Sequence, residues 1–180
     1  MKALILVDIQ TDFLPGGALA VPNGDAIIPI ANRLQAVFPL VVATQDWHPA
    51  NHGSFAANHP GKNLFEQIDL NGLPQTLWPV HCVQKTPGAE LAPGLEQERI
   101  AKIFPKGTDA GIDSYSGLFD NGHRKSTGLS RTGVRFHARK SALRQKLEKG
   151  FGANGRQGVH ARPTFQGHAQ RRGTFPRHPF

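Results

Sequence analysis

Two polar segments of the chain carry residues whose types and spacing suit metal chemistry. Asp46 and His48 lie two apart directly after an apolar run, and in extended backbone their side chains would face the same side. A carboxylate together with imidazoles suits a divalent transition metal such as Zn²⁺, Fe²⁺ or Mn²⁺. His52 or His81 could complete the set of ligands. The alternative is a surface loop rich in Asp, His and Asn that binds no metal.

Two charged residues near the ends of apolar runs are candidates for acid–base chemistry. Asp8 stands where a strand would present it as a general base, although a turn or capping carboxylate is the alternative. Lys106 could lower the pKa of a neighbour or hold a carboxylate, or it is a solvated loop lysine. Phe13 and Trp78 could stack on a flat ring, or they pack in an ordinary core.

The elements that must position these residues follow from the apolar pattern. Buried strands are expected over 3–9, 40–44 and 100–104, the last closed by Pro105, because each is a short continuous apolar run. A helix is expected over 25–38, with Pro29 in or near its first turn. Its apolar stripe would comprise Ala26, Ile27, Ile30, Ala31, Leu34, Val37 and Phe38. The stretch 46–99 is expected to be irregular. This order predicts a βαβ architecture with the site at the carboxyl ends of the strands.

Composition divides the chain of 180 residues near residue 129. Residues 1–129 hold 9 Lys+Arg and 12 Asp+Glu, whereas residues 130–180 hold 12 Lys+Arg and a single acid, Glu148. The second part is therefore a basic tail, with one short helix expected over 141–150. No signal peptide and no apolar run near the roughly 20 residues of a membrane span are apparent. One cysteine suits a reducing cytoplasm, where we expect the protein to be located.

Several unusual segments also recur in one order along residues 1–129. Together they resemble the nicotinamidase/pyrazinamidase group of the isochorismatase-like cysteine hydrolases. The matching segments are 3–13, 16–21, 44–55, 77–83, 104–107 and 113–122. The resemblance implies an α/β fold with a three-layer, Rossmann-like parallel sheet. Residues 1–129 would form the N-terminal part of this domain, and the sheet would be incomplete beyond them.

The resemblance also implies roles for the polar residues. Asp8 would take the proton of a cysteine nucleophile, and Lys106 would complete the Asp-Lys-Cys triad and favour the thiolate. One divalent ion, Zn, Fe or Mn, would hold the pyridine nitrogen of the substrate. Its ligands would be Asp46, His48 and His81, with His52 as the fourth ligand found in some members of the family.

The substrate implied by the resemblance is nicotinamide or a similar pyridine amide. Phe13 and Trp78 would sandwich the ring, and Tyr115 would lie near the pocket. Water would convert nicotinamide to nicotinate and ammonia, a step of NAD salvage. The implied partners are therefore this small molecule and, in some members, further copies of the chain. Neither a membrane nor nucleic acid is expected.

The chain departs from the family after residue 129. The family continues through a helix and a strand into a turn with the nucleophilic cysteine, but here no cysteine follows Ser130. Cys82 matches the cysteine beside a metal-ligand histidine, which does not attack substrate. The abrupt change of composition is typical of translation in a shifted frame, so we expect residues 130–180 to be non-native or disordered and the chain to be inactive. The alternative is a metal- or pyridine-binding remnant whose Arg-rich tail binds a polyanion or nucleic acid.

Overall fold

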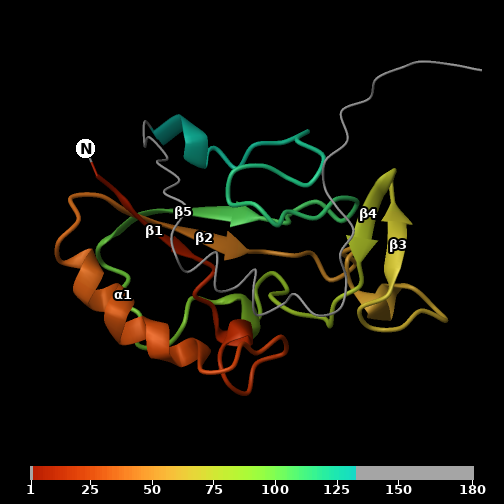
Figure 1. Cartoon of the computed structure of the whole chain (residues 1–180), viewed down its shortest axis with the longest axis horizontal. Coiled ribbons are helices and arrows are strands. Elements are labelled where there is room, and N and C mark those ends of the chain that lie inside the picture. Colours follow the sequence, from red (N-terminus) through yellow and green to blue (C-terminus); the bar gives the residue numbers. More distant parts are fainter. Residues whose placement is uncertain (1, 133–180) are drawn as a thin grey trace, which may run out of the picture. The chain divides into compact units, whose positions relative to one another are not determined.

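A three-stranded parallel sheet lies at the centre of the computed structural model, which describes residues 2–132. The strands follow the order β1-β2-β5 and both pairings are parallel (Figure 1). The predicted α/β class with a parallel sheet is confirmed. The helix and the strands are β1 (Leu4–Val7), α1 (Ile28–Gln35), β2 (Val41–Asp46), β3 (Gln67–Leu70), β4 (Leu73–Thr76) and β5 (Ile100–Lys106).

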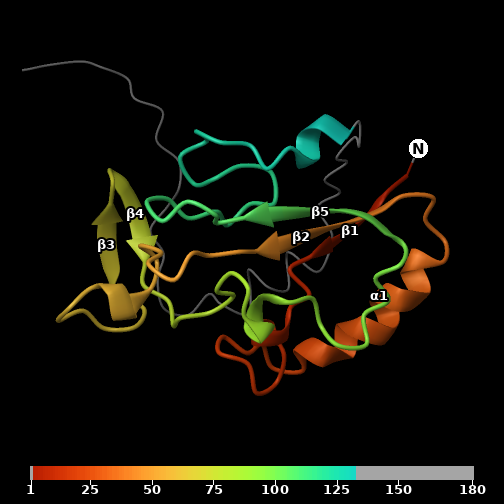
Figure 2. The ribbon, with the colours of Figure 1, turned by 180° about the vertical axis from the view of Figure 1, so that it is seen from behind.

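Strand β2 is the most buried strand because it has a neighbour on each side and covering chain on each face. Leu6 and Ala43 face the side on which Ala31 of α1 packs. Val42 and Phe104 face the opposite side, where Leu129 packs against them. Figures 1 and 2 show α1 and the segment around 117–132 on opposite sides of the sheet. A strand covered in this way needs apolar residues at successive positions, which is why the three runs were recognisable in the sequence.

Helix α1 is shorter than predicted, and it buries a different stripe. A 3-10 turn, Gly24–Ile27, precedes it, and Pro29 stands in its first turn as expected. The buried positions of the helix are Ala31 and Gln35, and the Gln35 amide donates to the Glu96 carbonyl at 2.8 Å. That hydrogen bond satisfies the amide nitrogen of the buried glutamine. The residues of the predicted stripe that the described residues leave exposed are Ala26, Ile27, Ile30, Leu34 and Val37.

A β-hairpin interrupts the stretch that we predicted to be irregular. Strands β3 and β4 pair antiparallel, with Leu70 opposite Leu73. The two residues between them, Asn71 and Gly72, have φ of 54° and 84°. Asn-Gly with both residues left-handed is a strong hairpin signal, and the sequence reading missed it. The hairpin lies beyond the carboxyl ends of β2 and β5 (Figure 1).

Strand β5 does not end at Pro105 as predicted but runs through it to Lys106. Pro105 pairs in register with Gln45, and β5 is an outer strand among the described strands. A proline is tolerated there because its missing N–H interrupts no ladder on the outer side. The described residues include no helix that is both long enough and apolar enough to cross a membrane. The predicted helix over 141–150, and the tail beyond Thr132, lie outside the described residues.

Candidate active site

The carboxyl ends of the three parallel strands bring Asp8, Asp46 and Lys106 together. Asp46 and Lys106 are the last residues of their strands and pair in register. Asp8 directly follows β1 with a left-handed φ of 50°, which turns the chain away from the sheet. Parallel strands present their ends at one edge, so charged residues far apart in sequence become neighbours.

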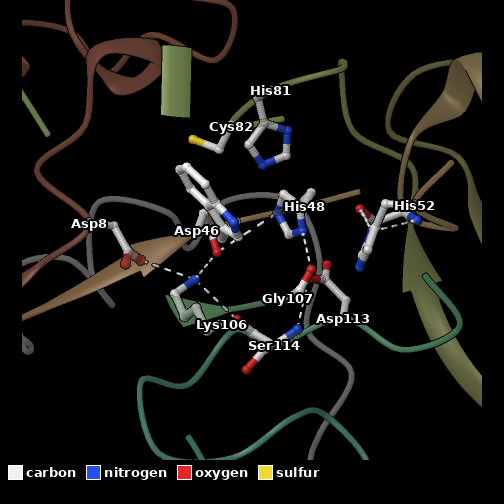
Figure 3. Close-up of polar contacts among 12 residues, drawn as sticks. Asp8, Asp46, His48, His52, His81, Cys82, Lys106, Gly107, Asp113 and Ser114 are labelled. Atoms are coloured by element: carbon white, nitrogen blue, oxygen red, sulfur yellow. Dashed lines mark hydrogen bonds and ion pairs between the residues drawn. The ribbon is translucent and has the colours of Figure 1, made fainter. Parts of the chain in front are cut away.

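Lys106 is the buried cation of this cluster, and both carboxylates contact it (Figure 3). Its Nζ lies 3.0 Å from Asp8 Oδ2, forms an ion pair with Asp46 Oδ1 and donates to the Ser114 carbonyl at 3.1 Å. Burial opposes the charge of the ammonium, but the two carboxylates outweigh burial and raise the pKa of Lys106. Lys106 therefore remains charged, and the solvated loop lysine of the alternative reading does not describe it.

The two carboxylates have different surroundings. Asp46 is buried, and burial, with the charge of Asp8 adding to it, raises the pKa of Asp46 to about 6 despite the attraction of Lys106. Asp8 is half-buried, and its Oδ1 accepts a hydrogen bond from Thr44 Oγ1 at 2.7 Å. Asp8 is thus held on one oxygen by a hydroxyl and on the other by an ammonium. This arrangement keeps the carboxylate oriented beside the cation.

Asp46, His48 and His81 form a group that suits a divalent metal. A carboxylate oxygen and one ring nitrogen from each histidine lie within 4.8 Å of one another, and all three residues are buried. His48 Nδ1 lies 2.9 Å from the Gly107 carbonyl, and His81 Nδ1 lies 2.7 Å from the Pro79 carbonyl. Carbonyl oxygens only accept, so each Nδ1 donates and each Nε2 of the neutral ring keeps its lone pair.

Burial also keeps two of the imidazoles neutral, as metal ligation requires. It lowers the pKa of His48 to about 4 and that of His52 to about 4. His48 Nε2 lies 3.8 Å from Asp46 Oδ1. One carboxylate and two imidazoles, with no thiolate among them, fit Zn²⁺, Fe²⁺ or Mn²⁺.

His52, the possible fourth ligand of the family resemblance, lies beside His48, with the two ring centroids 4.3 Å apart. It forms a second group of potential ligands with His48 and Asp113, all three buried. Its Nδ1 lies 2.7 Å from Ser54 Oγ, and its Nε2 has no hydrogen-bond partner among residues 2–132. Figure 3 shows the His52 ring on the side of Asp113, away from His81. Asp113 itself accepts from the Gln75 amide at 3.0 Å.

A pocket beside these residues contains all three aromatic candidates. It has a volume of about 140 Å³. The Trp78 indole donates to the Tyr115 hydroxyl at 3.2 Å, and the Phe13 ring centroid lies 5.8 Å from that of His81. Asp8 does not line this pocket but reaches it through Lys106. The lining residues are Phe13, Leu19, Asp46, His48, Trp78, His81, Lys106, Asp113, Ser114 and Tyr115.

Cys82, the single cysteine of the chain, is fully buried behind His81. Burial raises the pKa of its thiol, and the nearby charges of Asp46, Asp12 and Asp8 add to that effect. Its backbone N–H donates to Asp12 Oδ2 at 2.7 Å, and its φ is 47°. A buried thiol with a raised pKa is a poor nucleophile, because the thiolate is the reactive form.

Sequence reasoning missed the polar residues that support the site. Gln10, Gln75 and Asp113 each bond to a residue of the pocket, and Asp12 accepts from the backbone N–H of Cys82, next to His81. Gln10 and Asp12 lie two and four residues after Asp8, and polar residues just after a buried strand are a usable signal. Nothing local distinguishes Gln75, because its role depends on the hairpin placing it against Asp113.

The chain has detectable relatives of known kind, although no family model matches it. It is 54% identical over 132 residues to the nicotinamidase of Escherichia coli, a match that covers 71% of this chain and 62% of that protein. It is 36% identical over 140 residues to the nicotinamidase/pyrazinamidase of Mycobacterium tuberculosis, covering 74% of this chain and 67% of that protein.

Solved structures of nicotinamidases also match the chain, in both fold and sequence. An Acinetobacter baumanii nicotinamidase matches with a TM-score of 0.70 and 52% identity, over 72% of this chain and 63% of that one. The yeast nicotinamidase bound to the inhibitor nicotinaldehyde matches with a TM-score of 0.67 and 35% identity, over 73% and 68%. The chain spans 62% of the length of the E. coli relative. With identity at this level over two thirds of the M. tuberculosis protein, the chain belongs to the nicotinamidase/pyrazinamidase family.

Proposed function

We propose that residues 1–129 form the metal- and substrate-binding part of a nicotinamidase, which binds nicotinamide or a similar pyridine amide. The observation that carries the proposal is the convergence of the Asp46, His48 and His81 group, the Lys106–Asp8 ion pair and three aromatic side chains at one pocket. The family relationship supports the same substrate class. In the cell we place this chemistry in the cytoplasm, as part of NAD salvage.

Each residue has a role that its surroundings support. Asp46, His48 and His81 would hold one divalent ion, which when bound supplies Lewis-acid attraction for a ring nitrogen. Phe13 and Trp78 would hold the flat ring, and Tyr115, bonded to Trp78, would orient that indole. Lys106 would hold the Asp8 carboxylate in place through their ion pair, and Asp8 would accept a proton from a nucleophile. His52 would support the ligand set from the side of Asp113.

The reaction also needs a nucleophile, and the 180 residues offer only Cys82 as a thiol. Because that thiol is buried and its pKa is raised, we expect it to form no acyl intermediate. Loss of the nucleophile from a concerted catalytic set typically removes a factor of about 10⁶ in turnover. The chain is therefore expected to bind substrate and metal without useful turnover.

Ammonia release from nicotinamide by the purified 180-residue protein tests this proposal, together with calorimetric titration of nicotinamide into the Zn²⁺-loaded protein. We expect binding without measurable ammonia release, and no difference in ammonia release between the protein and Cys82→Ser. Robust turnover that Cys82→Ser abolishes would show that Cys82 is the nucleophile. Absence of nicotinamide binding at millimolar concentration would contradict the assigned substrate class.

A second candidate function is binding of a polyanion such as nucleic acid. The specific observation is the strong excess of Arg and Lys over acids in residues 130–180. Such binding would weaken steeply with salt, because each phosphate contact releases counterions. Retention on heparin at low salt, lost on removal of residues 133–180, would favour it; equal retention of the two proteins would exclude the tail as the cause.

A further inference from the structure

Gln10 is a buried glutamine whose side chain is almost fully hydrogen-bonded to backbone. Its exposed fraction is 0%. Its Oε1 accepts from the Asp46 N–H at 2.7 Å, and its Nε2 donates to the Asp46 carbonyl at 2.8 Å. The same Nε2 donates to the Ala89 carbonyl at 2.8 Å. One amide therefore holds both backbone groups of a residue 36 positions away.

The shape of the sheet explains why Asp46 needs this partner. Strand β1 pairs with β2 only as far as Val7 opposite Thr44, and at Asp8 the chain turns away from the ladder. Asp46, two residues beyond Thr44, points its N–H and carbonyl to the side that β1 no longer occupies. Buried backbone groups without a partner are costly, and the Gln10 amide offers the donor and the acceptor that a strand would have provided.

Holding the Asp46 backbone also fixes the Asp46 carboxylate. That carboxylate contacts Lys106 and lies 3.8 Å from His48 Nε2. The third bond of Gln10 reaches the turn Pro87–Ala89, where Gly88 packs on the Asp12 carboxylate that accepts from Cys82 N–H. Gln10, which holds Asp46, and Asp12, which holds the backbone next to His81, therefore both contact the turn Pro87–Ala89.

We propose that Gln10 is a positioning residue: its amide replaces a missing strand, fixes Asp46 and sets the geometry of the Asp46, His48 and His81 ligand group. The inference rests on the proposed metal role of those three residues. Gln45 provides a comparison within the same site. Its amide donates to the same Ala89 carbonyl at 2.9 Å, yet the side-chain hydrogen bonds that hold the Asp46 backbone come from Gln10.

The experiment compares Gln10→Met with Gln45→Met in the full 180-residue protein. Both substitutions keep side-chain length and remove an amide that donates to Ala89. We expect Gln10→Met to weaken Co²⁺ affinity by about 10- to 100-fold, the range typical of outer-shell partners of a metal site. The Co²⁺ absorption spectrum should change with it, and the Asp46 amide proton should exchange faster by NMR. Gln45→Met should leave the affinity within about twofold, the spectrum unchanged and the Asp46 amide protected.

Three results would overturn the inference: equal effects of the two variants, wild-type Co²⁺ affinity in Gln10→Met, or unchanged exchange of the Asp46 amide. If the wild-type protein binds no Co²⁺, the proposed metal group fails, and exchange of the Asp46 amide alone decides the role of Gln10.

If Gln10→Met does not fold, Gln10→Glu replaces it. That variant keeps the acceptor, so the Asp46 amide should stay protected while the lost donors weaken Co²⁺ binding; wild-type affinity there would overturn the inference too.

Discussion

At the scale of single residues, the site depends on a few buried side chains with well-defined partners. His48 belongs to both clusters of potential ligands, and its Nδ1–H bond to Gly107 fixes which ring nitrogen remains free. Lys106 contacts two carboxylates and offsets the repulsion between them. These two residues carry the sharpest residue-level predictions.

His48→Ala is expected to abolish binding of divalent metal, because it removes a ligand itself. The loss should exceed the roughly 10- to 100-fold typical of outer-shell changes. Metal content of tag-free protein, measured by mass spectrometry after loading with Zn²⁺, checks it. His59→Ala is the matched control, since the His59 ring donates to the Gly53 carbonyl at 2.8 Å and lies in neither cluster. Equal metal content in the wild type and His48→Ala would remove the ligand assignment.

Lys106→Met is expected to destabilise the metal-free protein by about 3–5 kcal/mol, because it leaves two neighbouring carboxylates without their cation. Urea unfolding followed by circular dichroism in the presence of EDTA measures the effect. Lys102→Met is the control, since Lys102 is exposed and only lies over the Phe104 ring, 4.9 Å from its centroid. A loss below about 1 kcal/mol at Lys106 would show that the cluster is more solvated than its burial indicates.

At the scale of elements, turns directly after the strands decide where the ligands lie. Gly107 follows β5 with a φ of 62°, and its Cα packs against the His48 ring. An added Cβ would collide with that ring, so the ring or the backbone at Gly107 must shift. Gly61 has a similar φ of 79° but has open space around it. Substitution of Gly61 therefore tests backbone strain alone, whereas substitution of Gly107 tests strain together with crowding of the His48 ring.

Gly107→Ala is therefore expected to cost more stability than Gly61→Ala and to weaken metal binding as well. Both variants carry the left-handed penalty of about 1–2 kcal/mol, but only Gly107→Ala displaces His48. Thermal unfolding and Co²⁺ titration of the two proteins make the comparison. Identical losses of stability, with Co²⁺ affinity intact in both, would mean that the His48 ring has room to yield.

At the scale of the whole molecule, the chain corresponds to only part of the length of its relatives. The chain spans 62% of the E. coli relative, and α1 with the residues that flank it leaves Ile27, Ile30, Leu34 and Val37 exposed among the described residues. An apolar stripe of this kind usually faces another part of a protein. The relatives contain further sequence that has no match here, and we expect that sequence to complete the sheet and to supply the nucleophile.

A chimera tests this expectation. Residues 1–129 followed by the part of the E. coli nicotinamidase beyond its match should release ammonia from nicotinamide. The same chimera with the cysteine of the added part changed to serine should not, because the acyl intermediate needs a thiolate. Turnover that survives this change, or a folded chimera that releases no ammonia, would contradict the roles proposed for Asp8 and Lys106.

The sequence alone determined the class of the fold and most of the candidate residues. Short apolar runs that end in polar residues are local patterns, so the strands ending near Asp8, Asp46 and Lys106 could be read directly. Because parallel strands share one edge, their convergence followed as well. Local patterns also contained the hairpin signal at Asn71-Gly72, which the reading overlooked.

Only the tertiary structure decided how those residues are partnered. That Lys106 contacts both carboxylates and that His52 lies with Asp113 depend on contacts between segments about 50 to 100 residues apart. The exposed stripe of α1 likewise depends on which of two adjacent helical faces meets the sheet. Gln10 holds Asp46 only because β1 turns away two residues too early to pair with it. Long-range packing chooses among partners that a local pattern leaves equivalent, because hydrogen bonds and ion pairs form wherever the folded chain brings complementary groups together.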